Sequence, residues 1–303
     1  MAKARALDKR RKSIQNTRKI TRTMELVAAA QFRKAMERAV SAGAYTQRIA
    51  SMVADLARAG SSVSHPLLEE RKTKNGSALL ILTANRGLCG GYNSSILRLG
   101  HQRADELNAG YENFQFLVSG KRGISYAKDR GIEMAAEYDQ FGVKPQFSEV
   151  VAIADQILAD YLAGKIDRFD VAYMKFISVS KQVPVVETLL PLSELGGEAE
   201  NESSAQKGAE YEFLPSPESI LEEIVPTAFR VKLFKCFLDA AVGEQIARRV
   251  AMKAATDNAD SMINILTRTY NRARQGQITN EIIEVSAGAK AQAMHRKKEK
   301  TQK

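Results

Sequence analysis

The chain has 303 residues, a formal net charge of +10 and two cysteines, Cys89 and Cys236. This length allows two domains, or one domain with an elongated element. The cysteines have no ligand spacing, which argues against a disulfide scaffold or a zinc site, and no run of eighteen apolar residues could span a membrane. The charge is concentrated at the ends, with +9 in residues 1–38 and +5 in residues 290–303. Such ends suit nucleic acid, anionic lipid or an acidic protein surface, or they are simply solvated.

The distribution of helix-breaking residues predicts the domain organisation. All seven prolines lie between Pro66 and Pro226, and fifteen of the nineteen glycines lie in residues 60–208. We therefore expect a compact central domain between two long terminal helices. The predicted parts are an N-terminal coiled-coil helix (1–59), a linker (60–76), a Rossmann-like α/β domain (77–192), a mobile loop (193–210) and a C-terminal coiled-coil helix with a basic tail (211–303).

The N-terminal helix is predicted to be one partner of an antiparallel coiled coil. Its expected inner positions are mostly small: Ile14, Thr17, Thr21, Met24, Ala28, Ala35, Ala39, Ile49, Val53 and Leu56. A helix with so narrow an apolar stripe needs a second helix of similar length. If Leu56 lies near Pro226, equal rise per residue puts Ile14 level with residues 267–270 and leaves α-helix beyond about Gln275 without a partner.

The central region alternates between the two types of secondary structure. Strands are expected at 77–83, 114–118, 169–177 and 183–189, and helices at 93–108, 120–131 and 147–163. This alternation predicts an α/β layer with a mainly parallel sheet.

The C-terminal helix repeats apolar or small residues in steps of three or four. The resulting stripe is too narrow for a helix that is buried on all sides. Its members are Ile224, Ala228, Val231, Phe234, Leu238, Val242, Ile246, Val250, Ala255, Ala259, Met262, Leu266, Tyr270 and Ala273.

The loop at 83–93 (TANRGLCGGYN) occupies the place where a doubly wound domain binds phosphate, between a strand and a helix. It carries neither a Walker pattern nor GxGxxG, so we interpret it as a tight structural turn. Cys89 has no histidine in a recognisable dyad, and no metal-ligand cluster is visible. We expect no catalytic residue, no cofactor and no metal; the chain is predicted to be a mechanical part and not an enzyme.

Several separated motifs resemble the gamma subunit of the rotary F-type ATP synthase. They are residues 12–21 (KSIQNTRKIT), Met24, 27–30 (VAAA), 87–93 (GLCGGYN), 251–259 (AMKAATDNA) and 270–281 (YNRARQGQITNE). The resemblance runs nearly end to end. It implies a non-catalytic central stalk: an antiparallel coiled coil inside a ring of three alpha and three beta subunits, with the α/β domain beside the epsilon subunit and the membrane rotor ring of c subunits. Proton flow through that ring would drive conformational cycling of beta, from the cytoplasmic face of a bacterial inner membrane.

The resemblance also implies contact residues. The beta subunits would be touched by Arg274, Gln275, Thr279 and Glu281, and by Met24 and Glu25 on the N-terminal helix. The foot facing the rotor ring would include Tyr211, Phe213 and Leu214. The chain departs from the family pattern at Glu25, where lysine is common, at Asn85, where aspartate is usual, and at Leu214, where a carboxylate is expected.

Two other classes of function are also compatible with the sequence. A basic coiled-coil protein that binds nucleic acid would explain the charged ends, although no reader motif is present. An enzyme with a Rossmann-like domain would need a cofactor fingerprint that the loop at 83–93 lacks.

Overall fold

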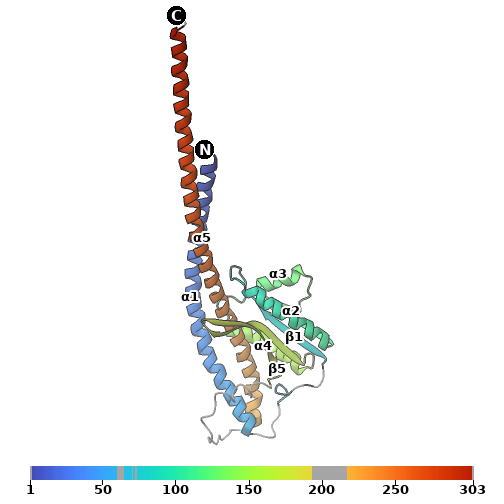
Figure 1. Cartoon of the computed structure of the whole chain (residues 1–303). Helices are drawn as coiled ribbons and strands as arrows, with labels where there is room; N and C mark the ends of the chain where they lie inside the picture. The colour runs from blue at the N-terminus through green and yellow to red at the C-terminus, as the bar shows by residue number, and fades with distance from the viewer. Residues whose placement is uncertain (1, 60–64, 70, 72–73, 193–216, 302–303) are drawn as a thin grey trace. The chain divides into compact units, whose positions relative to one another are not determined.

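The computed structural model describes residues 2–59, 65–69, 71, 74–192 and 217–301 (Figure 1). It divides into two compact units, which are described separately. The first unit joins Met1–Glu25 to Met252–Lys303, and the second is Leu26–Ala251. The predicted limits of the domains are not tested by this division and stay predictions.

The two longest elements are the helices α1 (Ala2–Ala59) and α5 (Pro217–Thr301). They pair antiparallel in each unit. In the first unit the Arg11 guanidinium lies 5.0 Å from the centre of the Tyr270 ring, and Arg18 forms a 2.9 Å ion pair with Asp260. In the second unit an apolar cluster joins the two helices through Ala35, Ala39, Leu238, Val242 and Ile246. The predicted antiparallel pairing is confirmed, and Ile14 lies within about one helical turn of its predicted level on α5.

A pair of buried hydroxyl groups lies in the seam of the first unit. Thr256 Oγ1 donates to Thr21 Oγ1 at 2.8 Å, and Thr21 Oγ1 in turn donates to the Arg18 carbonyl. Both threonines are buried. Because a buried polar group is costly without its partner, this pair favours one register of the coil over its neighbours.

The second unit contains a five-stranded sheet in the order β3-β2-β1-β4-β5. Its strands are β1 (Gly76–Leu82), β2 (Asn113–Ser119), β3 (Ala136–Tyr138), β4 (Arg168–Ser178) and β5 (Lys181–Leu190). The pairs β1–β2, β1–β4 and β2–β3 are parallel, and β4–β5 is an antiparallel hairpin. The predicted mainly parallel α/β sheet is confirmed, while the short edge strand β3 was missed.

Helices cover both faces of this sheet. The strand β1 is buried on both sides, and its residues alternate between two cores. Leu79 and Ile81 face α2 (Tyr92–Gly110) and α3 (Lys121–Asp129). Leu80 and Leu82 face α4 (Phe147–Leu162) and the N-terminal half of α5. The strand order reverses between β1 and β4, so the loop after β1 begins at the usual ligand crevice of a doubly wound fold.

The prediction of a narrow apolar stripe on α5 is wrong for residues 225–248. There the helix packs against α1 on one side and against the sheet on another, and its buried side chains include Phe229, Leu233, Cys236 and Phe237, none of which was in the predicted stripe. Val250, predicted for the seam, is 62% exposed. Burial by two neighbours removes the single-stripe pattern.

Pro226 lies inside α5 and does not end it. Its ring removes one backbone donor, but Val225, Ala228 and Phe229 around it are buried in the core. Tertiary packing thus holds a helix that proline alone would weaken. Within the described residues no helix is apolar enough over eighteen residues to cross a bilayer.

Candidate functional site

The C-terminal part of α5 continues beyond its partner helix (Figure 1). In the first unit Ala4 lies beside Gln277 and Ile278. The N-terminal end of α1 is therefore level with about residue 280 on α5. About twenty further residues of helix follow, or about 30 Å. Every described side chain from 280 to 293 is exposed. The predicted overhang is confirmed, beginning about one turn later than expected.

Large apolar side chains on this overhang are more than half exposed to solvent. Ile282 is 64% exposed, Ile283 59% and Val285 73%, and Ile278 just below them is 43% exposed. A single helix cannot bury such residues on itself, and a contiguous exposed apolar surface marks a site of association. The overhang is therefore a candidate interface for a partner.

The predicted beta-subunit contacts at this end are all exposed. Thr279 Oγ1 donates to the Gln275 carbonyl, and Glu281 accepts a 3.0 Å hydrogen bond from Gln277 Nε2. Arg274 and Glu281 are seven residues apart and so share one face of the helix, while Gln275 and Thr279 share the next. Their backbone is fixed by the helix, and their polar ends are available to a partner.

Met24 and Glu25 lie apart from that group. Since Thr21 faces Thr256, Glu25 is level with about residue 252, and Arg274 lies about 22 residues, or about 33 Å, farther along α5. Glu25 is largely buried and pairs with Arg22 at 2.8 Å within its own helix. The six residues therefore form two separate patches. The predicted foot residues Tyr211, Phe213 and Leu214 lie outside the described residues.

A basic groove lies between the two helices at the base of the overhang. It has a volume of about 510 Å³ and is lined by Ala4, Arg5, Asp8, Lys9, Lys12, Tyr270, Arg274, Gln277 and Ile278. Four of these residues are cationic, and the one acid, Asp8, already pairs with Arg11 and Lys12. The groove thus has an excess of positive charge and suits an acidic partner.

The glycine loop, residues 83–93, is the second candidate site of the sequence analysis. Its backbone is in the left-handed region at Leu88, with φ 64°, and at Gly90, with φ 57°. Asn93 Oδ1 accepts from the Ala84 backbone N–H, and Asn93 Nδ2 donates to Cys89 Sγ at 3.3 Å. These bonds close the loop on itself, as expected of a structural turn.

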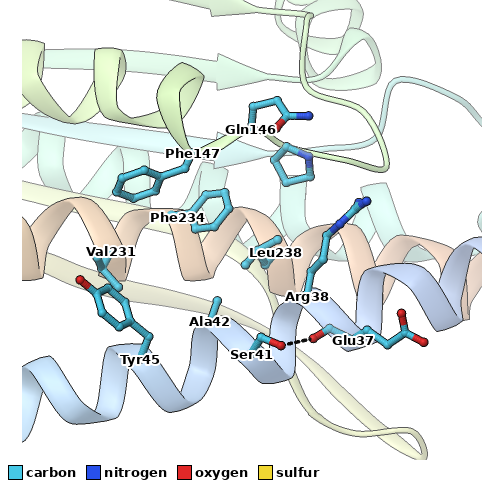
Figure 2. A pocket seen from close by; sticks show the side chains of 11 residues that line it. Glu37, Arg38, Ser41, Ala42, Tyr45, Gln146, Phe147, Val231, Phe234 and Leu238 are labelled. Atoms are coloured by element: carbon cyan, nitrogen blue, oxygen red, sulfur yellow. Dashed lines mark hydrogen bonds between the residues drawn. The ribbon is translucent and has the colours of Figure 1, made fainter.

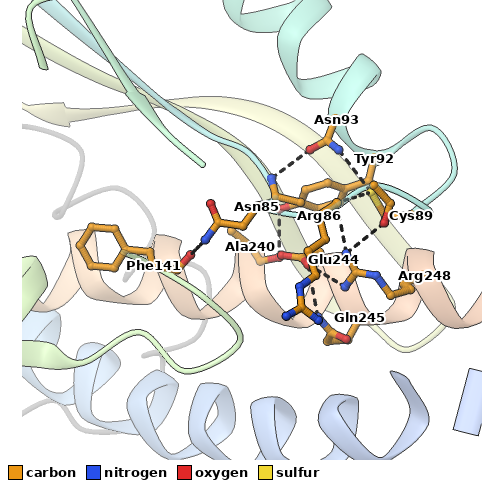
Figure 3. A network of polar contacts seen from close by, with 12 residues as sticks. Asn85, Arg86, Cys89, Tyr92, Asn93, Phe141, Ala240, Glu244, Gln245 and Arg248 are labelled. Carbon is orange, nitrogen blue, oxygen red and sulfur yellow. Dashed lines mark hydrogen bonds and ion pairs between the residues drawn. The ribbon is translucent and has the colours of Figure 1, made fainter. Parts of the chain in front are cut away.

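The glycine loop is also bonded to α5 (Figure 3). Arg248 Nη2 donates to the carbonyl oxygens of Arg86 and Gly87 at 3.3 and 3.4 Å, and Arg248 Nη1 forms a 2.6 Å ion pair with Glu244. Tyr92 donates its hydroxyl proton to the Ala240 carbonyl at 3.0 Å. At a place where related folds direct N–H groups at a phosphate, this loop directs carbonyl groups at a guanidinium.

Glu244 and Arg248 were missed by the sequence analysis. The signal that could have found them is an acid and an arginine four residues apart in a helix rich in apolar residues, since charged residues are rarely buried unless paired. Burial raises the pKa of Glu244, and the charges of Arg248 and Arg86 oppose that rise.

Asn85 explains one departure from the family pattern. Its Nδ2 donates to the carbonyl oxygens of Asp139 and Phe141 at 3.0 and 2.6 Å, while its Oδ1 accepts from the Lys121 backbone N–H at 2.9 Å. A carboxylate could replace only the accepting role. The amide therefore suits the two carbonyl groups that this chain presents.

An apolar groove of about 640 Å³ lies in the second unit, between α1, α5 and the start of α4 (Figure 2). Phe147 and Phe234 meet edge to face there, with ring centres 5.3 Å apart. Glu37 and Arg38 are the only titratable side chains besides Tyr45 in its lining. The groove brings no nucleophile and base together, and the described residues hold no cluster of three metal-ligating side chains.

Both thiols are expected to resist alkylation in the native protein. Cys89 and Cys236 are each 2% exposed, and burial raises the pKa of both thiols. At pH 8 we expect iodoacetamide to label neither within the time that labels both in urea, because the thiolate is the reactive form. Mass spectrometry of tryptic peptides measures this. Rapid labelling of Cys89 in the folded chain would show that the glycine loop opens.

Three comparisons with known proteins give one consistent result. A family model described as ATP synthase matches residues 3–292. The ATP synthase gamma chain of Rhodopirellula baltica is 58% identical over 293 residues, covering 96% of this chain and 99% of the relative. That of Desulforamulus reducens is 39% identical, again over 96% of this chain and 99% of the relative.

Solved structures agree on the fold. A chain in the Euglena gracilis mitochondrial ATP synthase structure described as OSCP/F1/c-ring has a TM-score of 0.64 at 16% identity, with 96% of this chain and 94% of that chain covered. A chain of the rotor structure from the same organism has a TM-score of 0.60 at 15% identity, covering 91% and 99%.

Proposed function

Because the chain belongs to the ATP synthase gamma-chain family, we propose that it works as a non-catalytic central stalk that couples proton flow through a membrane rotor ring to ATP synthesis or hydrolysis. The single observation that carries this proposal is the overhang of α5, whose exposed isoleucines and valine require a surrounding partner. A helix whose faces differ presents a different surface to each subunit of a threefold ring. It can thus favour a different nucleotide affinity in each.

The proposed partners are three alpha and three beta subunits around the coil, and an epsilon subunit and a ring of c subunits at the foot. The basic groove beside Arg274 supports the first assignment, because its charge complements an acidic loop of beta. Tyr211, Phe213 and Leu214 remain the proposed foot contacts. The predicted domain limits, from the helix 1–59 to the helix 211–303, are part of the same proposal.

In this proposal the chain is a peripheral member of a membrane complex on the cytoplasmic face of a bacterial inner membrane. It holds no nucleotide or metal itself. The glycine loop supports that view, because a guanidinium and α5 occupy the place where a phosphate would bind in related folds.

Reconstitution tests the function directly. Mixing this chain with the alpha and beta subunits of the same organism is expected to give a stable complex whose ATP hydrolysis depends on the chain. Size-exclusion chromatography and a coupled hydrolysis assay measure the two outcomes. A chain that never assembles with alpha and beta, at any ratio or ionic strength, contradicts the central-stalk function.

Charge reversal tests the contact face on the overhang. Arg274→Glu with Glu281→Arg keeps the net charge and is expected to slow ATP synthesis about fivefold, which corresponds to about 1 kcal/mol in the coupled step. The rate is measured in reconstituted vesicles. The matched control reverses two exposed charges on another face of α5, Arg268→Glu with Asp257→Arg. An equal loss in both double variants would mean that Arg274 and Glu281 have no special role.

A further inference from the structure

We propose that Glu244 and Arg248 form a clamp that fixes the glycine loop to α5, so that the α/β domain and the helix turn as one body. In this clamp Arg248 bonds directly to the loop, and Glu244 is a positioning residue that orients the Arg248 guanidinium. The inference rests on the proposed central-stalk function, because only a stalk that transmits torque needs a joint that resists sliding.

Arg248 links three groups with one planar side chain. One nitrogen, Nη1, pairs with Glu244 Oε1, while Nη2 reaches the carbonyl oxygens of Arg86 and Gly87 (Figure 3). Arg248 is only 9% exposed, so water competes little for these bonds. Lysine has a single ammonium on a flexible stem and could not hold the carboxylate and both carbonyls in this geometry.

Glu244 fixes the direction of that guanidinium. Its carboxylate is one helical turn before Arg248 on α5, and its side chain is 13% exposed. The Arg86 charge also acts on it, which ties the acid electrostatically to the loop as well as to its own helix. A neutral glutamine there would keep the shape but lose the charged bond that orients Arg248.

The glycine loop needs an external support. Leu88 is the only non-glycine residue in the described parts of the chain with a positive φ, and its side chain is 59% exposed. A left-handed conformation at such a residue carries strain and persists only where neighbouring contacts hold it. The two carbonyl groups that Arg248 binds come immediately before Leu88, so the clamp holds the strained turn at its start.

A second anchor lies on the same face of α5. Ala240, Glu244, Arg248 and Ala251 form one stripe of that helix at steps of three or four residues. Tyr92 donates to Ala240 at one end of the stripe, and burial raises its pKa so that the hydroxyl keeps its proton. Gly243 lets β4 come close to α5 beside this anchor, since a Cβ there would lie 2.8 Å from Met174 Cγ and 3.6 Å from Tyr92 Cε2.

Hydrogen bonds and the ion pair have preferred directions, so they can hold the glycine loop at one position on α5. Apolar packing stabilises the contact between sheet and helix, but the hydrophobic effect is not directional. The bonds from Arg248 and Tyr92 have fixed partners on both sides. They resist displacement of the loop along the helix or around it.

Paired substitutions test the clamp in the assembled, membrane-reconstituted complex. Arg248→Lys and Glu244→Gln are expected to lower ATP synthesis at least fivefold while ATP hydrolysis changes less than twofold. The control is Arg249→Lys, the same change at the adjacent exposed position, which should leave both rates at wild-type level. A structural defect would lower hydrolysis and assembly together with synthesis. If Arg248→Lys behaves like Arg249→Lys, the clamp has no role in coupling.

A covalent replacement tests the same idea in the opposite direction. A Cβ built on Gly90 would lie 3.7 Å from the Ala251 Cβ, within the range of a disulfide. In a Cys89→Ser, Glu244→Gln background, Gly90→Cys with Ala251→Cys should regain synthesis when oxidised and lose it again under dithiothreitol. A cysteine at position 90 is strained in both forms, because Gly90 has φ 57°. The synthesis rate of the reduced sample therefore serves as the baseline for the oxidised one.

Each outcome bears on one claim. A disulfide that forms by mass but leaves synthesis low overturns the clamp, and one that does not form contradicts the close approach of loop and helix. If the unmodified chain fails to support synthesis with its partner subunits, the proposed function fails instead, independently of the variants.

Discussion

Replacing Gly120 by alanine is expected to unfold the α/β domain or to lower its free energy of unfolding by at least about 3 kcal/mol. Gly120 has φ 98° and ψ 135°, a conformation that costs any other residue about 1–3 kcal/mol. The added Cβ would also overlap the Thr83 carbonyl oxygen, which is backbone and cannot turn away. Urea unfolding of the purified chain, followed by circular dichroism, measures the loss.

The surroundings of Gly120 make relief difficult. Its N–H donates to the Tyr138 carbonyl, and its own carbonyl accepts from Thr83 Oγ1, so the ends of β1, β2 and β3 meet there. Gly110→Ala is the matched control, because nothing lies within 4 Å of a Cβ at that helix end. That variant should be neutral or more stable by up to about 1 kcal/mol. Equal stabilities for the two variants would contradict the backbone geometry at Gly120.

Asp170→Ala is expected to have the second largest effect, a loss of about 3 kcal/mol in the free energy of unfolding. Asp170 is completely buried and accepts from Arg103 Nε at 2.7 Å and from Arg168 Nε at 3.0 Å. Removing one member of a buried ion pair leaves the other charges uncompensated. The value is at the low end for such a change because both arginines are partly exposed. Thermal and urea unfolding measure it.

An exposed ion pair provides the comparison for Asp170. Asp155 pairs with Arg230 at 2.7 Å, but its side chain is 49% exposed. Solvent screens such a pair, so Asp155→Ala should cost less than about 1 kcal/mol. If Asp170→Ala costs no more than Asp155→Ala, the buried cluster is not a major source of stability.

Much of the architecture could be predicted because its signals are local. The confinement of proline to residues 66–226 reveals two long helices, and alternating apolar runs reveal β1, β2, β4 and the helices between them. The antiparallel pairing was predicted because each terminal helix has only a narrow apolar stripe and needs a partner helix to bury it. The strand β3 has only three residues and depends on β2 for its hydrogen bonds, so no local pattern marks it.

The buried surfaces of α5 could not be predicted from periodicity. Residues 225–248 contact both α1 and the sheet, and a helix with two neighbours loses the single stripe on which the prediction depends. Val250 fits the repeat but is exposed. The sequence shows the spacing of the apolar residues on α5, but which faces of that helix are buried depends on where the sheet packs against it.

The candidate sites differ in how far the sequence reveals them. Arg274 and Glu281 were named from a family resemblance, and the structure adds that both are exposed, far from Met24 and Glu25 along the coil. The link from Arg248 to the glycine loop came only from the structure, because its partners there are backbone carbonyl groups about 160 residues away in the chain. Backbone acceptors have no sequence signature.

The buried hydroxyl pair of Thr21 and Thr256 has a consequence for rotation. Each residue of an α-helix turns the chain by about 100° around its axis. A slip of α5 by one residue against α1 would therefore redirect every side chain on the overhang by nearly a third of a revolution. With the three catalytic subunits that we propose around the stalk, that error would turn each face of the overhang toward the wrong subunit. The hydrogen-bonded pair Thr21–Thr256 thus fixes the direction in which the side chains of the overhang point relative to α1.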